Sequence, residues 1–376
     1  MVKQVFSNAI LLEGNELEVT HGYLVIRDGM IEEIGEGAPH KRAKDLKRAF
    51  VLPPFINAHT HVADSVAKDI YLGKTQSQVV GPKGAKFREL RSRTEKEVIA
   101  SVRATLKDML QTGTLVHCDF REGGFAGVEL LRRASDSPVN SIVLGRPSAA
   151  ELDKILKVSD GIGLPSLEEF EPTALKRTAR RVRAAKKILA VHVAETDDAQ
   201  RASISATGKS EVKRALELNP SFVVHATWGV KEDFDALRRA SVPVVFCPRA
   251  NSLLGVGVPP IHFALAKSAK FCLGTDNVTV NRPNMFGELA FAWACLRRAS
   301  SDAGSEEARE LLRAATVGPL MLFDLPWGPI EKGNPATFMV LARRHNLVNL
   351  TDVHAGIVNR AQADNIRGIY LRGKII

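Results

Sequence analysis

One stretch, residues 51–61, reads Val-Leu-Pro-Pro-Phe-Ile-Asn-Ala-His-Thr-His and ends in two histidines, His59 and His61. Alternation along a strand puts residues i and i+2 on the same face, so both imidazoles can point in one direction. From residue 50 onward, short apolar runs alternate with charged stretches of helical periodicity. That rhythm is typical of βα units and of a parallel sheet.

Eight candidate strands follow this rhythm, with helical stretches between them. Eight parallel strands connected by helices predict a closed barrel rather than an open sheet. The sequence therefore predicts an α/β fold, a (β/α)8 TIM barrel over residues 50–324. The predicted strands are 50–57, 114–119, 141–145, 161–165, 188–194, 222–226, 243–247 and 271–274, and the clearest helical stretches are 94–111, 173–187, 211–218 and 231–240.

The two ends of the chain carry strand signals of another kind. Apolar or alternating runs separated by Gly-containing turns indicate short strands. We therefore expect both ends to meet in one small β domain, formed by residues 1–49 and 325–376, with the barrel inserted between them. The predicted strands of this domain are 6–12, 23–27, 30–34, 336–341 and 366–376.

Composition narrows the class of protein. The four cysteines, Cys118, Cys247, Cys272 and Cys295, form no CxxC pair, which predicts reduced thiols in a cytoplasmic protein. No apolar run approaches the ~20 residues of a membrane span, and the N-terminus lacks the pattern of a signal peptide. The formal net charge of +10 can attract nucleic acid or anionic metabolites. Because no nucleic-acid motif accompanies this charge, we expect no nucleic-acid partner and no membrane partner.

Residues suited to metal binding fall at the ends of the predicted strands. His59 and His61 end the first strand, His192 lies in the fifth, His225 ends the sixth, and Asp276 follows the eighth. A closed barrel brings these positions together at its C-terminal face. A lone strand histidine is more often a hydrogen-bonded core residue than a ligand. Five such residues at strand ends are a far less probable coincidence, and imidazoles with a carboxylate suit a borderline divalent ion.

The same residues suggest a hydrolytic chemistry. A metal ion with an open position lowers the pKa of a bound water from 15.7 towards about 7, which yields a metal-bound hydroxide. Asp276 can ligate the ion and also accept a proton. Glu195, three residues after His192, is placed to shuttle a proton to the substrate, and His225 can stabilise charge that develops in the reaction.

Four segments resemble motifs of the amidohydrolase superfamily. Residues 51–61 are similar to its PGFINxHxH, residues 192–196 (His-Val-Ala-Glu-Thr) to its HxAET, residues 247–251 (Cys-Pro-Arg-Ala-Asn) to CPRSN, and residues 274–277 (Gly-Thr-Asp-Asn) to GTDx. The match runs in family order from about residue 20 to 345. The four segments resemble most those of the branch of the superfamily that contains cytosine, guanine and S-adenosylhomocysteine deaminases and triazine hydrolases.

The resemblance implies more than the residues do alone. It implies a β-sandwich built from both termini, one zinc or iron ion, and a homodimer. It also implies that His59, His61, His192 and Asp276 are ligands and that Glu195 and His225 transfer protons. Dinuclear members use a lysine on strand 4. The predicted fourth strand here holds none, which favours a single metal ion.

The substrate is less defined by the sequence. Arg121, Arg146 and Arg249 follow predicted strands, and arginine is suited to a bidentate grip on an anionic group. With Asn277, they are the candidate substrate-binding residues for a small molecule. We expect deamination of a purine, pyrimidine or pterin type of N-heterocycle that bears an anionic group. The alternatives are hydrolysis of a cyclic amide, a formimino group or another C–N or C–Cl bond, a catalytically inactive binding protein, and a nucleic-acid-binding protein.

Overall fold

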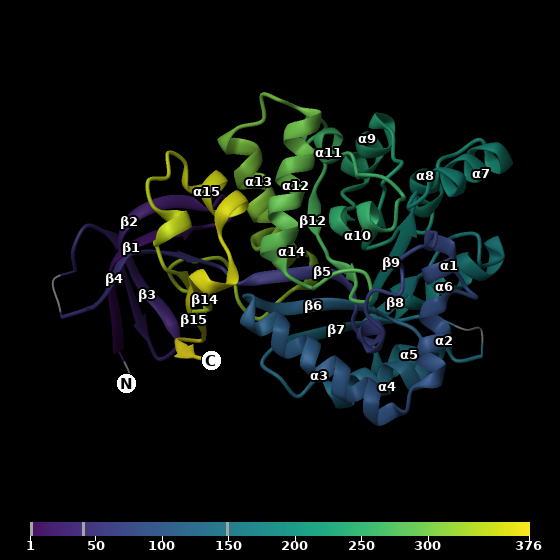
Figure 1. Ribbon diagram of the computed structural model, residues 1–376, viewed down its shortest axis with the longest axis horizontal. Helices are drawn as coiled ribbons and strands as arrows, with labels where there is room; N and C mark the ends of the chain where they lie inside the picture. The colour runs from purple at the N-terminus through teal and green to yellow at the C-terminus, as the bar shows by residue number, and fades with distance from the viewer. Residues whose placement is uncertain (1–2, 40–41, 148–149) are drawn as a thin grey trace.

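The computed structural model describes residues 3–39, 42–147 and 150–376, which form two sheets with helices packed around one of them (Figure 1). Every neighbouring pair in the larger sheet is parallel. Its strands are β5 (Phe55–His61), β6 (Thr114–Arg121), β7 (Asn140–Gly145), β8 (Gly161–Leu164), β9 (Ile188–Val193), β10 (Phe222–His225), β11 (Val244–Phe246), β12 (Phe271–Leu273) and β13 (Asp276–Asn277).

The last strand closes this sheet into a barrel. β12 pairs with β11, β13 pairs with β5, and only Gly274 and Thr275 separate the two pieces. The amide of Gly274 donates to the carbonyl of Phe246 on β11 at 2.9 Å, and the amide of Thr275 donates to that of His59 on β5 at 3.1 Å. A Cβ at Gly274 would lie 2.7 Å from the backbone of His59, so glycine permits this close approach. The predicted (β/α)8 barrel is confirmed.

The helices of the barrel pack their apolar faces onto the strands. In α3, buried Val98, Val102 and Leu106 recur every four residues, and Thr94 caps the helix in a reciprocal pair with Glu97. In Figure 1, α3 to α5 lie below the strands and α12 to α14 above them. The helices are α1 (Gln76–Val80), α2 (Ala85–Ser92), α3 (Glu95–Gln111), α4 (Gly124–Ala134), α5 (Leu152–Val158), α6 (Pro172–Ala184), α7 (Asp197–Thr207), α8 (Glu211–Leu216), α9 (Lys231–Ala240), α10 (Pro248–Leu253), α11 (Ile261–Ala266), α12 (Met285–Ala299), α13 (Ser305–Ala315), α14 (Val317–Phe323) and α15 (Val353–Arg360), with 3-10 turns η1 (Val62–Val66), η2 (His345–Leu347) and η3 (Ala363–Asn365).

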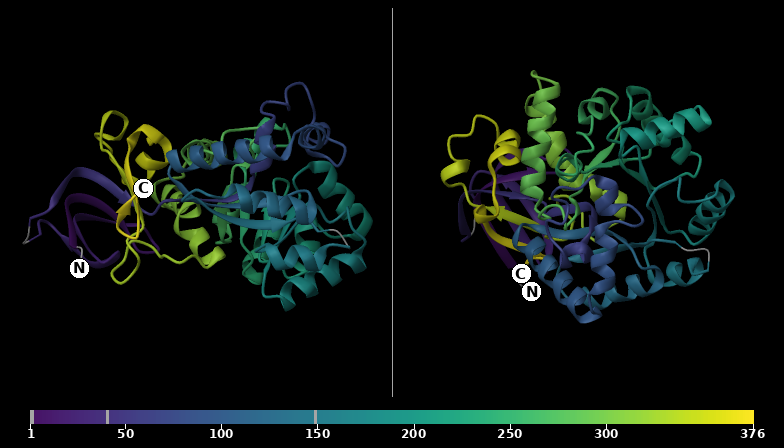
Figure 2. Two further views of the ribbon diagram at one scale, coloured as in Figure 1. Left: turned by 90° about the horizontal axis from the view of Figure 1, so that it is seen from below. Right: turned by 45° about the vertical axis from the view of Figure 1, so that its right-hand side comes forward.

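The second sheet is built from both ends of the chain and lies to one side of the barrel (Figure 2). It curls around its own core, where the ring of Phe6 packs 6.0 Å from Phe338 and 5.5 Å from Tyr370. The edge strand that contains Ile31 lies against the C-terminal part of the chain, because the backbone amide of Ile31 donates to the carbonyl of Asn334 at 2.9 Å. Its order is β16 (Lys374–Ile375), β15 (Ile366–Leu371), β14 (Phe338–Leu341), β4 (Lys44–Leu52), β1 (Lys3–Glu13), β2 (Glu18–Arg27) and β3 (Met30–Glu36).

One predicted strand was wrong in its bounds. Residues 50–57 were expected to form the first barrel strand, but Phe50–Leu52 complete β4 of the terminal sheet and the barrel strand begins at Phe55. Pro53 and Pro54 lie between them, and proline supplies no amide to a strand ladder. The apolar run of residues 50–57 therefore contributes strand residues to both sheets. The domain boundaries expected at 49/50 and 324/325 stay a prediction.

The helices in the described ranges offer no candidate for a membrane span, because none of them combines sufficient length with sufficient apolar character.

Candidate active site

Five buried polar residues converge at the carboxyl ends of four barrel strands. His59 and His61 lie on one face of β5, His192 on β9, His225 at the end of β10, and Asp276 on β13. His59, His61 and Asp276 form one cluster of possible metal-binding atoms, and His59, His192 and His225 form another. The two clusters share His59, so the predicted convergence is present.

The distances between these atoms fit a tetrahedral divalent ion. Nε2 of His59 lies 3.3 Å from Nε2 of His192 and 3.2 Å from Oδ1 of Asp276, and Nε2 of His61 lies 3.4 Å from the same oxygen. Zinc bonds of about 2.0–2.1 Å at tetrahedral angles place neighbouring donor atoms about 3.3 Å apart. His59, His61, His192 and Asp276 therefore fit as the holders of one ion.

The electrostatics of the site suit the same ion. Burial lowers the pKa of His59 to about 4 and that of His192 well below its ordinary value, so both rings are neutral near pH 7. Burial alone would raise the pKa of Asp276, but its hydrogen bond with His59 holds it below its usual value. Neutral imidazoles and an ionised carboxylate are the forms that bind a cation.

Glu195 and His225 lie beside this cluster. Oε1 of Glu195 accepts a hydrogen bond from Nε2 of Gln76 at 2.9 Å, and Oε2 lies 3.8 Å from Nε2 of His225. On the other side of its ring, His225 has Nδ1 3.2 Å from the amide nitrogen of Asn251. Asn251 is placed by α10, which begins at Pro248, a residue suited to the first turn of a helix. The carboxylate is thus held with one oxygen towards the cluster.

Backbone strain is concentrated at these strand ends. Ala194, His225 and Asp276 adopt φ angles of 46°, 72° and 59°, in the left-handed region that side chains other than glycine rarely occupy. Such conformations cost about 1–3 kcal/mol each and persist where surrounding structure fixes them, which is often a functional site. Here they occur directly before Glu195 and at two residues of the cluster.

A cavity of about 250 Å³ opens over the cluster. Arg146 and Asn277, two of the predicted substrate-binding residues, line it, and the guanidinium of Arg146 lies 5.5 Å from the ring of Phe87. The cavity is also lined by His61, Gln76, Lys86, His192, Glu195 and His225.

The structure corrects the prediction for Arg121 and Arg249, which lie outside the residues that line this cavity. Arg121 is only 2% exposed and pairs with Glu122 and, at 3.2 Å, with Asp119. Arg249 donates to the carbonyl of Arg282 at 3.2 Å and lies 3.7 Å from Glu288. Both guanidinium groups are used within the protein, so neither faces the substrate.

Sequence reasoning missed three residues of the site. Gln76 reaches Glu195 from the connection after β5, Lys86 lines the cavity from the same connection, and Oε1 of Glu122 lies 2.8 Å from Nδ1 of His61. The cations of residues 81–88 were noticed as a group, but no motif distinguished Lys86 among them.

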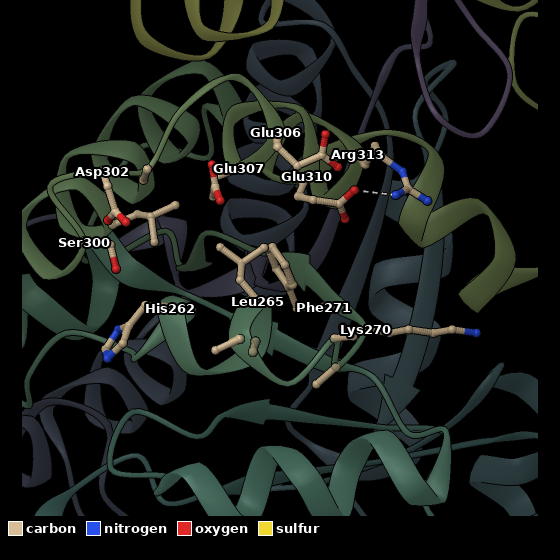
Figure 3. Close-up of a pocket in the computed structure, with 16 residues that line it drawn as sticks. His262, Leu265, Lys270, Phe271, Ser300, Asp302, Glu306, Glu307, Glu310 and Arg313 are labelled. Atoms are coloured by element: carbon tan, nitrogen blue, oxygen red, sulfur yellow. Dashed lines mark hydrogen bonds and ion pairs between the residues drawn. The ribbon is translucent and has the colours of Figure 1, made fainter.

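A larger cavity, of about 620 Å³, lies around the amino end of β12 (Figure 3). Its acidic residues are Asp302 and three from α13, and those of α13 have partners on the helix or directly before it. Glu310 pairs with Arg313 and Glu306 with Arg309, both at 2.5 Å, and Glu307 accepts from the amide of Gly304 at 2.7 Å.

The fold and the site define a class of protein, and the chain belongs to the amidohydrolase family, whose model matches residues 50–376. It is a hydrolytic enzyme that acts on C–N bonds. A protein of Methanothermobacter thermautotrophicus, provisionally named an aminohydrolase, is 34% identical over 99% of this chain and 98% of its own length. The 5-methylthioadenosine/S-adenosylhomocysteine deaminase of Pyrococcus furiosus is 24% identical over 99% and 94%.

Solved structures share the fold at lower sequence identity. An atrazine chlorohydrolase from Arthrobacter aurescens, crystallised with zinc, superposes with a TM-score of 0.83, covering 99% of this chain and 94% of its own at 18% identity.

Proposed function

We propose that the protein is a metal-dependent deaminase that hydrolyses an amino group from an N-heterocycle of the purine, pyrimidine or pterin type. The observation that carries the proposal is the set of donor atoms on His59, His61, His192 and Asp276, spaced 3.2–3.4 Å apart beside Glu195 in one cavity. The deaminase name of the Pyrococcus furiosus relative supports this choice of reaction.

The four donors would hold one divalent ion, and zinc is our first choice, with iron as the alternative. An ion in this position polarises a water molecule and makes it more acidic. The zinc in the related chlorohydrolase crystal supports this choice. The predicted fourth strand corresponds to β8, whose residues Gly161–Leu164 contain no lysine, as a one-ion site requires.

The side chains of this chain move the protons. Hydrolysis adds water across the ring C=N bond, with the hydroxyl on the carbon that bears the amino group and a proton on the ring nitrogen, and ammonia then leaves while a carbonyl or hydroxyl group forms. The Glu195 carboxylate takes a proton from the attacking water and delivers it to the ring nitrogen or the leaving amine. His225, 3.8 Å from Glu195, stabilises negative charge that develops on the substrate oxygen.

We also propose that Arg146 binds an anionic group of the substrate. Its guanidinium lines the cavity and lies against Phe87, and no carboxylate partner for its side chain is found in the described part of the chain. Asn277 also lines the cavity, although its amide nitrogen donates to Asp64 at 2.9 Å. Asn277 therefore offers its carbonyl oxygen to the substrate.

An ammonia-release screen tests the reaction. The zinc-loaded and iron-loaded protein is incubated with aminated purines, pyrimidines and pterins, with and without phosphate or carboxylate groups. A hit that Glu195→Gln abolishes establishes deamination and identifies the ring. Silence across the panel, with about one metal ion bound per chain, would reject deamination and favour hydrolysis of a cyclic amide, a formimino group or a C–Cl bond. Light scattering of the same sample tests the expected homodimer.

A further inference from the structure

A buried group of five charged residues lies behind the metal donors and takes no part in the chemistry proposed above. We call it the Lys86 cluster. Each member is at most 5% exposed, which is rare for charged side chains. Its members are Asp64 in η1, Lys86 in α2, Asp119 and Arg121 in β6, and Glu122 directly after β6.

Lys86 joins segments that are far apart in the sequence. Its ammonium pairs with Glu122 and lies 3.7 Å from Asp64. Glu122 also pairs with Arg121, which in turn lies 3.2 Å from Asp119. The side chain of Lys86, which belongs to the connection between β5 and α3, therefore lies between the end of β6 and the turn η1 that follows β5.

The cluster reaches the metal donors at two points. Oε1 of Glu122 lies 2.8 Å from Nδ1 of His61, the ring nitrogen that does not face Asp276. Asp64 accepts from the amide nitrogen of Asn277 at 2.9 Å and from the backbone amide of Thr279 at 3.1 Å. Asn277 directly follows Asp276, so the same ammonium supports the surroundings of two of the four donors.

Stability alone is a poor reason for this arrangement. Buried ion pairs lose so much hydration that apolar residues of similar volume usually serve a core as well or better. A carboxylate on the second nitrogen of a metal-binding imidazole, in contrast, fixes the orientation and tautomer of the ring. His192 has a neutral partner in the corresponding place, the carbonyl of Leu164 at 2.8 Å. Of these two rings, His61 is thus the one whose second nitrogen lies beside a charged group.

We propose that Glu122 and Lys86 are positioning residues of the metal centre. The Glu122 carboxylate, 2.8 Å from Nδ1 of His61, favours the ring orientation in which Nε2 faces the ion, and Lys86 keeps Glu122 and Asp64 in place. The proposal rests on the proposed function only in that it requires the ion to bind. Through Lys86, the connection after β5 supports the metal centre. Gln76 of the same connection donates a hydrogen bond to Glu195.

The test measures metal binding, so it does not depend on knowing the substrate. Glu122→Gln and Lys86→Met are compared with wild type for zinc affinity, by competition with a chromogenic chelator, and for the visible absorption spectrum of the cobalt-loaded protein. Glu288→Gln is the matched control, because Glu288 is also fully buried and paired with an arginine, Arg249, and no hydrogen bond or ion pair joins it to any of the four donors in the described part of the chain.

We expect Glu122→Gln to weaken zinc binding by about 10- to 100-fold and to change the cobalt spectrum, as losses of such partners do. Lys86→Met should weaken it by roughly tenfold, and the double variant should bind more weakly than Glu122→Gln but by less than the two losses combined, since the residues share the path through His61 while Lys86 also holds Asp64. Glu288→Gln should stay within about threefold of wild type.

Zinc affinity and a cobalt spectrum that match wild type in a folded Glu122→Gln or Lys86→Met would overturn the proposal. An equal loss in Glu288→Gln would also overturn it, because the effect would then be general. If both cluster variants lose their fold, the milder Glu122→Asp decides, and an unchanged affinity in that variant assigns the cluster to stability alone. Failure of wild type itself to bind zinc or iron would instead reject the proposed metal site.

Discussion

The cavities at the two ends of the barrel differ in what their polar groups contact. The larger one, about 620 Å³ at the amino end of β12, is lined by acids that include Glu306 and Glu310, which pair with arginines of their own helix. The smaller one, about 250 Å³ at the carboxyl ends, is lined by His61 and His192, which turn Nε2 towards Asp276 and His59, other donors of the metal type. Size is therefore the weaker sign of a functional site, and buried polar atoms turned towards one another are the stronger one.

Two fully buried histidines of adjacent strands show the same difference on a smaller scale. His117 on β6 lies 2.9 Å from Thr60 and 2.7 Å from Ser141, so both ring nitrogens have hydroxyl partners. His59 on β5 faces His192 and Asp276 through Nε2. Burial lowers the pKa of each ring to about 4, so the partners separate the core residue from the candidate ligand.

Replacing these two histidines should produce the largest difference. His59→Ala should lose the bound zinc and at least about 10³-fold in turnover, because the ion supplies several kcal/mol of transition-state stabilisation. His117→Gln should keep the metal and lose about 1–3 kcal/mol in the free energy of unfolding through its hydroxyl partners. Elemental analysis, ammonia release and urea unfolding measure these effects. Retained zinc in His59→Ala would remove this histidine from the ligand set.

One glutamate from each cavity provides the next comparison. Glu195→Gln should keep its zinc and lose roughly 10²- to 10⁴-fold in kcat, since proton transfer by a positioned carboxylate contributes that much. Glu310→Gln, in the larger cavity, should leave kcat unchanged, because its carboxylate serves a pair within α13. Steady-state kinetics of both variants on the substrate found in the screen measure this difference. Equal losses of kcat in the two variants would contradict the distinction between the cavities.

Acid should destabilise the metal-free protein through both buried histidines. The pKa of His59 and of His117 is lowered to about 4, so between about pH 6.5 and 4 the unfolded chain binds protons that the folded chain does not. Stability therefore falls as pH falls through this window, by about 2 kcal/mol for each histidine at pH 5. Urea unfolding near pH 7 and pH 5 measures the loss. His117→Gln should reduce it, and a flat profile in wild type would show that the folded protein takes up these protons as readily as the unfolded chain does.

The two arginines near the strand ends should differ by the smallest amount. Arg146→Ala should raise KM for an anionic substrate by about tenfold, as the loss of a hydrogen bond to a charged group does. Arg249→Ala should raise it by less than about threefold, because Arg249 lies outside the cavity lining and donates to Arg282. A neutral analogue of the substrate is the control, since its KM should not respond to Arg146→Ala.

Much of the fold and the central donors could be predicted from the sequence because they depend on local periodicity. Strand alternation places His59 and His61 on one face, and a closed barrel brings the end of each strand to the same rim. The structure brings the expected donors together. The bounds of the first strand failed because Pro53 and Pro54 interrupt a continuous apolar run.

Side chains on the connections could not be placed in the same way. Arg121 ends β6, Arg146 directly follows β7 and Arg249 lies at the start of α10 after β11, yet only Arg146 lines the cavity. Which way each guanidinium turns depends on carboxylates that the fold brings near it, such as Asp119 and Glu122 beside Arg121. A position near a strand end in the sequence therefore predicts that a side chain lies near the rim of the barrel. The available ion-pair partners determine which way that side chain points.

The sequence by itself determined the barrel, the second sheet built from both termini, and the histidines and aspartate that meet at the strand ends, because these follow from periods of two and 3.6 residues and from strand order. Only the tertiary structure decided that Lys86 and Glu122 stand behind His61 and that Gln76 bonds to Glu195. The physical reason is distance along the chain: these pairs are brought together by the packing of a long connection, and no local pattern encodes which buried charge will meet which partner.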